Sequence, residues 1–467
     1  MKLLPKTWRV LLGWGLLTGA LTVHAACGDE LNGLVVDKGA AKARSALSGQ
    51  AAGPAEPNPV DALPPETQLQ LIAREAVRRS AGAGAAALLA EAARFDEDQA
   101  RAALAPVVTV GGSVGPVRST FDGATLRSGM QVSGTLAASG ILWDGGRTQA
   151  VIRYRQELRD AARFNAQSTQ EQVVLDALSA TLERNRYRSQ ARVYQQYARK
   201  MGCLVDALEQ IVAVDRGRAS ELVQARKTQA QAELARDSAL ALSRQLEIRL
   251  RKYVGEQGGL GEGVSGPLSQ IMDTGEIIRL IERSSELQLM RAQADGAGHL
   301  AASADAALRP QVTWSANATQ GSLGGAPNSA VQAGVSIAYN LFNAGADKSA
   351  AAAAARRAEA ARRQYEESLN TRTARAFEVQ ELASSAFDRA RRYVDVLKDS
   401  ERVRVSTFQQ WSQLGKRSLF DVMSAEGDHF ALRVAYVNAL YDGYQASAQL
   451  RSIGGGLLGW LGVGEVR

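Results

Sequence analysis

The feature that most constrains the fold is an alternating pattern that runs directly into a long helical pattern, and it occurs twice. In residues 329–342, apolar and polar side chains alternate, as in a strand with one apolar face. Residues 347–414 follow with an Ala- and Arg-rich helical pattern that contains no Pro or Gly. The same succession occurs earlier, where an alternating stretch at 128–143 ends at Asp144-Gly145-Gly146 and a charged helical pattern begins. One structural unit is therefore predicted to occur twice.

The spacing of corresponding residues supports a duplication. Pro106 corresponds to Pro310, an offset of 310 − 106 = 204, and Gly217 corresponds to Gly415, an offset of 415 − 217 = 198. The first long helical pattern spans about 70 residues with Gly202 as its only breaker, which makes a helix on the order of 100 Å long. Helices of this length predict a rod, a coiled coil or a helical tube rather than a globular core.

The duplication defines the predicted domain organisation. A signal peptide (1–26) and a flexible N-terminal leader (27–65) come first. A first repeat (66–267), a second repeat (268–453) and a C-terminal tail (454–467) follow. The first repeat is predicted to contain a helix, strands at about 107–115 and 128–143, a long helix at about 146–215 and a return helix at about 221–254. The second is predicted to contain a helix, strands at about 311–319 and 329–342, a long helix at about 347–414 and a return helix at about 420–452. Residues 116–127 and 320–328 are predicted to be loops, and Gly82 and Gly84 indicate that the first helix is two helices in series.

The N-terminus has the pattern of a targeting segment. Three basic residues in the first nine precede an apolar run from Val10 to Val23 and a small-residue cleavage pattern. Cys27 leaves two alternatives open, because it is either the lipidated first residue of the mature chain or an ordinary residue near the cleavage point. A disulfide between Cys27 and Cys203 is a further alternative. The leader is read as a flexible segment or as a strap across a neighbouring subunit.

Composition excludes several classes of function. The formal net charge is +7, but the basic residues form no stripe with interleaved aromatic residues, so no nucleic-acid partner is predicted. His24, His299 and His429 have no metal-ligand spacing, and no phosphate-binding or serine-hydrolase motif is present. We therefore predict no catalytic residue, no metal and no cofactor.

Four amphipathic strands cannot close a barrel by themselves, and open strand edges are not tolerated in hydrocarbon. No run after the signal approaches the ~20 apolar residues of a membrane-spanning helix. If the chain enters a membrane, it must do so with strands pooled from several copies. The long helices leave only one end of each strand pair, so they would continue such a barrel as a helical tube.

The sequence resembles the TolC family of outer membrane factors, which serve Gram-negative efflux pumps and type I secretion systems. The residues that carry the resemblance are the two strand starts (Leu104-Ala105-Pro106 and Leu308-Arg309-Pro310), the two strand ends (ILWDGG at 141–146 and NLFNAG at 340–345) and the two turns between long helices (GRASELVQA at 217–225 and GKRSLFDVMSA at 415–425). The resemblance implies an α+β membrane protein: a homotrimer with a 12-stranded outer-membrane β-barrel, four strands per chain, continuous with a long periplasmic α-helical barrel. It also implies an equatorial belt around 255–267 and the termini.

The same resemblance implies a gate at the helix tips. Arg417 matches the family's tip arginine, Asp421 the first of two aperture carboxylates, and Glu221 the acidic partner on the first-half tip. Ser424 replaces the second carboxylate, which weakens the case for a doubled acidic ring. An Arg417–Glu221 pair could lock the tips, whereas the alternative is that these are solvated charges at helix ends. Candidate docking residues for an adaptor are Gly217, Arg218, Ser220, Gly415, Lys416 and Ser418.

The function predicted from these observations is a passive exit duct. It would contact outer-membrane lipid, a periplasmic adaptor protein and an inner-membrane transporter, expected to be of the ABC type. Type I protein secretion is favoured over the alternative of small-molecule efflux because of the long leader. A second alternative is a periplasmic coiled-coil adaptor or scaffold, which would not explain four amphipathic strands.

Overall fold

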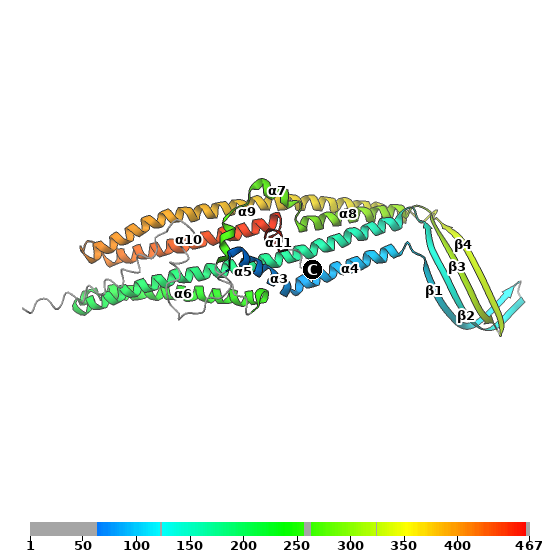
Figure 1. The fold of residues 1–467 in the computed structure, drawn as a ribbon, viewed down its shortest axis with the longest axis horizontal. Coiled ribbons are helices and arrows are strands. Elements are labelled where there is room, and N and C mark those ends of the chain that lie inside the picture. The colour runs from blue at the N-terminus through cyan, green and yellow to red at the C-terminus, as the bar shows by residue number, and fades with distance from the viewer. Residues whose placement is uncertain (1–62, 122–123, 256–262, 324, 464–467) are drawn as a thin grey trace, which may run out of the picture.

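The computed structural model describes residues 63–121, 124–255, 263–323 and 325–463. The predicted signal peptide, Cys27 and nearly all of the leader lie outside this range. The described chain is an elongated rod of helices with a strand sheet at one end, and the turns between the long helices lie at the opposite end (Figure 1).

The sheet consists of four antiparallel strands in the order β1-β2-β3-β4, namely β1 (Val107–Phe121), β2 (Ala124–Trp143), β3 (Gln311–Leu323) and β4 (Ala326–Ala338). The first hairpin corrects the prediction of a loop at 116–127, because both strands continue through most of that stretch. Pro116 lies within β1, opposite Met130 on β2. Both strands also extend into the predicted loop at 320–328, because β3 ends at Leu323 and β4 begins at Ala326, whereas β4 ends at Ala338 rather than at 342.

The two faces of the sheet differ as the alternation predicts. One face carries exposed apolar side chains on neighbouring strands, among them Val108, Val110, Val114, Val132, Leu136, Val331, Val335 and Ile337. The other face carries a polar ladder, in which the Ser113 and Ser133 hydroxyl oxygens are 2.8 Å apart and those of Thr135 and Thr319 are 3.3 Å apart. The sheet therefore presents one face suited to lipid and one suited to water.

Two helical hairpins of nearly equal dimensions form the rod. The first hairpin is α5 (Arg147–Val214, 68 residues) with α6 (Ala219–Val254, 36 residues). The second hairpin is α9 (Ala346–Ser412, 67 residues) with α10 (Leu419–Gly454, 36 residues). Gly146 and Gly345, which precede α5 and α9, both have left-handed backbone conformations with φ of 90° and 82°. The strand-to-helix joint is thus built in the same way in both halves.

Shorter helices complete each half: α3 (Pro65–Arg79), α4 (Ala81–Ala102), α7 (Thr274–Ile281), α8 (Ser285–Ala306) and α11 (Leu457–Trp460). The first helix of the chain is divided in two, but the break lies at Ser80 rather than at Gly82. The Ser80 hydroxyl accepts a hydrogen bond from the Ala83 backbone N–H at 3.2 Å, so this residue caps α4.

The buried apolar residues form three separate clusters along the rod rather than one core. A middle cluster joins α3, α5, α6, α10 and α11. A second cluster joins α7, α8, α9 and α10. The third, which we call the tip cluster, consists of Met201, Leu204, Val205, Leu208, Ala225, Leu419, Val422 and Met423. The tip cluster packs the ends of the two helical hairpins against each other.

Candidate functional site

The turns between the long helices, at the end of the rod farthest from the sheet, carry the predicted gate and docking residues (Figure 1). The first turn is a short 3-10 helix (Arg216–Arg218), in which the Asp215 carboxylate accepts a hydrogen bond from the Gly217 N–H at 3.0 Å. The second turn reverses at Gly415, which has a φ of +61°. Five of the six predicted docking residues lie on these turns and Ser220 lies in the first turn of α6; five are exposed and Arg218 is half-buried.

The structure gives Asp421 a local role. Its carboxylate accepts hydrogen bonds from the Ser418 backbone N–H and hydroxyl, both at 3.0 Å, while the Asp421 N–H donates to the Ser418 hydroxyl at 3.2 Å. This reciprocal arrangement is a capping box that begins α10. The backbone and side-chain hydrogen bonds from Ser418 lower the pKa of Asp421, and the nearby Arg417 charge contributes in the same direction. Asp421 is therefore ionised at neutral pH.

The other predicted gate residues are not joined within the protomer. The exposed Arg417 donates to the Gln410 side-chain oxygen at 3.2 Å, and no ion pair joins it to Glu221 in the described part of the protomer. Glu221 is half-buried, and its Oε2 atom is buried without a hydrogen-bond partner among the described residues. Ser424 is exposed on α10. The gate role of these four residues stays a prediction for the assembled protein.

A buried group of charged residues lies just above the tip cluster and was missed by the sequence analysis. We call it the buried charge cluster: Lys200 on α5, Arg404 on α9, Glu426 and His429 on α10, and Glu401 on α9, which lies at the edge of the group with its side chain 38% exposed. The side chain of Glu426 is fully buried and that of Arg404 is 6% exposed. The Arg404 Nη1 atom donates to both Glu426 carboxylate oxygens, at 3.0 and 3.3 Å, and the Arg404 Nε atom donates to Glu401 at 2.9 Å. The Lys200 Nζ atom lies 3.8 Å from Glu426 Oε1.

The charges within this cluster balance, because two cations (Lys200 and Arg404) face two carboxylates (Glu401 and Glu426). Burial raises the pKa of Glu426, while the Arg404 and Lys200 charges oppose that shift. Burial lowers the pKa of Arg404, but its hydrogen bonds and ion pairs with Glu401 and Glu426 outweigh this effect and raise the pKa overall. The arrangement is a hydrogen-bonded ion group in a low-dielectric setting, where leaving one partner unpaired is costly. No short-range sequence pattern could have identified it, because Lys200 and Glu426 are 226 positions apart (426 − 200).

His429 makes the stability of this region sensitive to acid. Burial lowers its pKa from 6.5 to about 4, and the Arg404 charge acts in the same direction. The unfolded chain therefore binds a proton below pH 6.5 that the folded chain does not bind until about pH 4, so stability falls as the pH drops through this window.

The free energy of unfolding is expected to fall less between pH 7 and pH 5 in His429→Gln than in the wild type, by about 2 kcal/mol, because glutamine does not titrate. Thermal unfolding of both proteins at the two pH values measures this, and an equal loss in the variant would contradict it.

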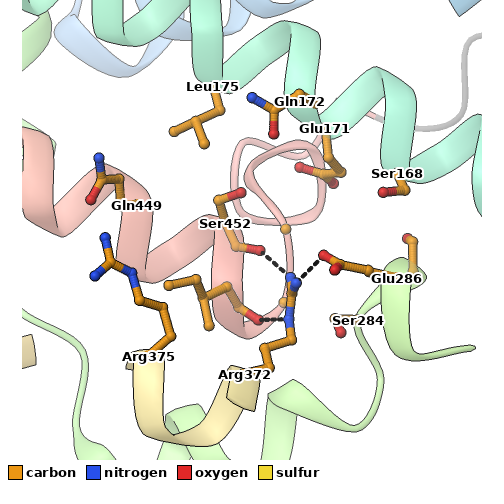
Figure 2. Close-up of a pocket in the computed structure, with 14 residues that line it drawn as sticks. Ser168, Glu171, Gln172, Leu175, Ser284, Glu286, Arg372, Arg375, Gln449 and Ser452 are labelled. Carbon is orange, nitrogen blue, oxygen red and sulfur yellow. Dashed lines mark hydrogen bonds and ion pairs between the residues drawn. The ribbon is translucent and has the colours of Figure 1, made fainter. Parts of the chain in front are cut away.

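A cleft of about 270 Å³ lies where the C-terminal end of α10 meets α5, α9 and the start of α8 (Figure 2). Arg372 of α9 crosses it and caps α10, because its Nε and Nη2 atoms donate to the carbonyl oxygens of Ile453 (3.1 Å) and Ser452 (3.3 Å). Its Nη1 atom also bonds to Glu286. All three nitrogen atoms of this guanidinium therefore bind groups of the protein itself.

Glu171 of α5 has a similar role on the other side of the cleft (Figure 2). Its carboxylate accepts hydrogen bonds from the backbone N–H groups of Leu457 (2.6 Å) and Leu458 (3.2 Å). Burial raises the pKa of Glu171, and these hydrogen bonds oppose the shift. Gly456 has a φ of +87°, and a Cβ there would overlap the Glu171 carboxylate. The residues around the cleft thus stabilise the end of α10 and the turn that leads into α11.

Within the described residues, no group of three or more His, Cys, Asp or Glu side chains is placed to hold a metal ion. No described helix combines the length and apolar character that crossing a membrane requires. Cys203 on α5 is disulfide-bonded, and Cys27, the other cysteine of the chain, lies outside the described residues.

The comparisons with known proteins agree with this architecture. The family model described as "Outer membrane efflux protein" matches residues 277–456. A search of curated proteins finds no significant match in sequence. Among solved structures, one of CusC superposes with a TM-score of 0.77 at 17% identity and covers 88% of this chain and 96% of that chain. The outer membrane protein VceC from Vibrio cholerae gives a TM-score of 0.74 at 18% identity, covering 84% and 96%. The CmeC outer membrane channel from Campylobacter jejuni gives 0.70 at 13%, covering 87% and 93%.

These findings show that the chain shares the fold of solved outer membrane channel proteins, with a strand-and-helix unit that occurs twice. The match of residues 277–456 to the outer membrane efflux protein family and the fold shared with solved outer membrane channels both agree with the resemblance to the TolC family. This family consists of transport proteins rather than enzymes, as the sequence predicted.

Proposed function

We propose that three copies of the chain assemble into one exit duct of a tripartite export machine. The observation that carries this proposal is the four-stranded sheet, whose β1 and β4 edges have no partner strand among the described residues of the protomer although one face is apolar. In lipid, unpaired backbone groups at such edges cost several kcal/mol each, so the edges must pair between copies. Three copies supply 4 × 3 = 12 strands for a closed barrel, and the helical hairpins continue it as a tube.

The cargo that we propose first is a small solute. The description of the matching family model as an efflux protein supports this choice over the protein secretion that the long leader suggested. Type I protein secretion stays the second candidate, because the long leader suggested it. The leader lies outside the described residues, so the structure does not test this suggestion. In either case the duct needs a periplasmic adaptor and an inner-membrane transporter, which would supply the energy and dock at the tip turns.

Reconstitution tests the channel itself, and a deletion strain separates the two cargoes. The purified wild-type protein is expected to run as a trimer and to form discrete channels in planar bilayers. A strain without the gene is expected to become more susceptible to small toxic solutes while its secreted proteins are unchanged. A protein that inserts as a monomer without conductance would overturn the proposal, and loss of one secreted protein with unchanged susceptibility would favour secretion.

The tip gate leads to a prediction about conductance. Three symmetric copies of Asp421 and Arg417 would lie around a narrow opening, so replacing either residue with Asn or Gln, respectively, is expected to raise single-channel conductance. Ser418→Ala is the matched control for Asp421→Asn, because it breaks the same capping box without removing a carboxylate. Equal increases in Ser418→Ala and Asp421→Asn would assign the effect to the cap, and unchanged conductance in both gate variants would remove the gate role.

A further inference from the structure

Cys203 lies in the part of α5 that approaches the tip turns, and it forms a disulfide. The sequence contains two cysteines, and the other is Cys27. Cys27 lies outside the described residues, so the identity of the partner follows from the bonded state of Cys203 and from the number of cysteines in the chain.

The position of Cys203 on α5 allows a partner to approach from outside the rod. Met201 and Leu204, on either side of it, are buried in the tip cluster, whereas Cys203 itself is half-buried. Asp206 and Gln210, about one and two turns further along the same face of α5, are exposed. A disulfide at Cys203 therefore does not require the tip cluster to open.

Symmetry excludes Cys203 of another copy as the partner of every Cys203 in the proposed trimer. Three symmetric copies would bring three equivalent thiols, and a disulfide joins two of them, so one would always remain without a partner. A bond between two different cysteines has no such restriction. The pair that leaves no thiol over is Cys27 with Cys203.

The length of the leader permits this bond. Leu69 of α3 and Leu178 of α5 are buried in the same middle cluster. Cys203 is 203 − 178 = 25 residues further along α5, which is about 38 Å at the rise of a helix. From Cys27 to Pro65, the first residue of α3, the chain advances 65 − 27 = 38 residues, which span up to about 125 Å when extended. The leader can therefore reach Cys203 while α3 stays in its place.

We propose that a disulfide between Cys27 and Cys203 of the same chain fixes the start of the mature chain to α5 near the tip turns, and that Cys27 carries no lipid. Cys203 is 11 residues before Val214, the last residue of α5, which is about 17 Å along the helix. A sulfur atom in a disulfide cannot also form the thioether of a lipid anchor. His24 agrees with this assignment, because an apolar residue such as leucine is usual three positions before a lipidated cysteine.

The bond forms by oxidation of two thiols in thiol–disulfide exchange. The thiolate of one cysteine attacks the disulfide of a periplasmic thiol–disulfide oxidant and forms a mixed disulfide, from which the second thiolate displaces the oxidant. Two electrons and two protons thus pass from the two thiols to the oxidant, which leaves as a dithiol. The inference goes beyond the proposed export function, because it requires an oxidising compartment and no channel activity.

The test counts thiols in the full-length protein isolated from the outer-membrane fraction, using a maleimide label of known mass under denaturing conditions. The wild type is expected to take up no label before reduction and two labels after it. Cys203→Ser and Cys27→Ser are each expected to take up one label without reduction. Trypsin digestion of the unreduced wild type is expected to give residues 201–216 linked to the N-terminal peptide that ends at Lys38, and reduction is expected to separate the two.

The processing of Cys27→Ser decides between the disulfide and the lipid anchor. This variant is expected to lose its signal peptide as the wild type does, because ordinary cleavage does not require the cysteine. Accumulation of an uncleaved precursor, or the mass of a diacylglycerol on Cys27 in the wild type, would overturn the proposal.

The remaining outcomes concern the bond itself. Label on the unreduced wild type would overturn the disulfide. A covalent dimer or trimer that reduction converts to a monomer would overturn the assignment of the bond to one chain. A monomer under both conditions, together with the linked peptide, would support it. If the protein forms no channel in planar bilayers, the proposed function fails while the result of the thiol count is unaffected.

Discussion

Replacing Leu136 with Arg is expected to prevent most of the protein from reaching the folded, membrane-inserted state. Leu136 lies on β2 midway along the apolar face, opposite Val110 on β1 and Ala318 on β3, and its side chain is exposed. An arginine facing lipid near the middle of the bilayer costs about 2–4 kcal/mol. In a trimer the cost is incurred three times in one assembly, so the combined effect is expected to exceed that of any single surface change.

Thr135→Arg is the matched control, because Thr135 is the preceding residue on the same strand and faces the other side of the sheet. Its hydroxyl oxygen lies 3.3 Å from that of Thr319 on the polar face. An arginine there would point into the water-filled interior of the barrel, so it is expected to change ion selectivity while leaving insertion intact. The measurement is the amount of trimer in the outer-membrane fraction. Equal amounts for Leu136→Arg and Thr135→Arg would show that the apolar face does not contact lipid.

Arg404→Met is expected to destabilise the protein by about 3–5 kcal/mol per chain, because it leaves a fully buried carboxylate with its main partner removed. Glu426 would retain only the Lys200 ammonium at 3.8 Å, and Glu401 would lose its hydrogen bonds from the guanidinium. The side chain of methionine fills a similar volume, so the loss would report the missing charge and hydrogen bonds rather than a cavity.

Arg402→Met is the control, because Arg402 lies on the same helix and pairs with Asp399 while its side chain is 80% exposed. An exposed pair contributes about 0–1 kcal/mol, so this variant is expected to unfold close to the wild-type temperature. Thermal unfolding of the detergent-solubilised proteins, followed by circular dichroism, measures both. Similar unfolding temperatures for Arg404→Met and wild type would show that the cluster contributes little to stability.

Much of the architecture could be predicted from residue order. Strand parity places Val132 and Leu136 on one face and Ser133 and Thr135 on the other because successive side chains point to opposite sides. The lengths of α5 and α9 follow from the absence of Pro and the scarcity of Gly, because these two residues are the strongest local helix breakers. Both patterns are local, so one sequence is enough to detect them.

The error at residues 116–127 arose because pairing between two strands overrides the local preference for a loop. Pro116 and its polar neighbours suggested a loop, but β2 supplies the hydrogen bonds that extend β1 to Phe121. Asp421 was predicted as a gate residue from the resemblance, and the structure adds that its carboxylate forms a capping box with Ser418, a pattern that the spacing of these two residues could have indicated.

The sequence by itself determined the duplicated unit, the faces of its strands and the lengths of its long helices, because periodicity and helix breakers act within a few residues of each position. Only the tertiary structure decided which charges are buried. Lys200, Arg404 and Glu426 each resemble ordinary solvated residues of a charged helix in the sequence. They form one buried group because α5, α9 and α10 pack together there, and the cost of removing a charge from water depends on which surfaces meet rather than on the neighbouring residues in the chain.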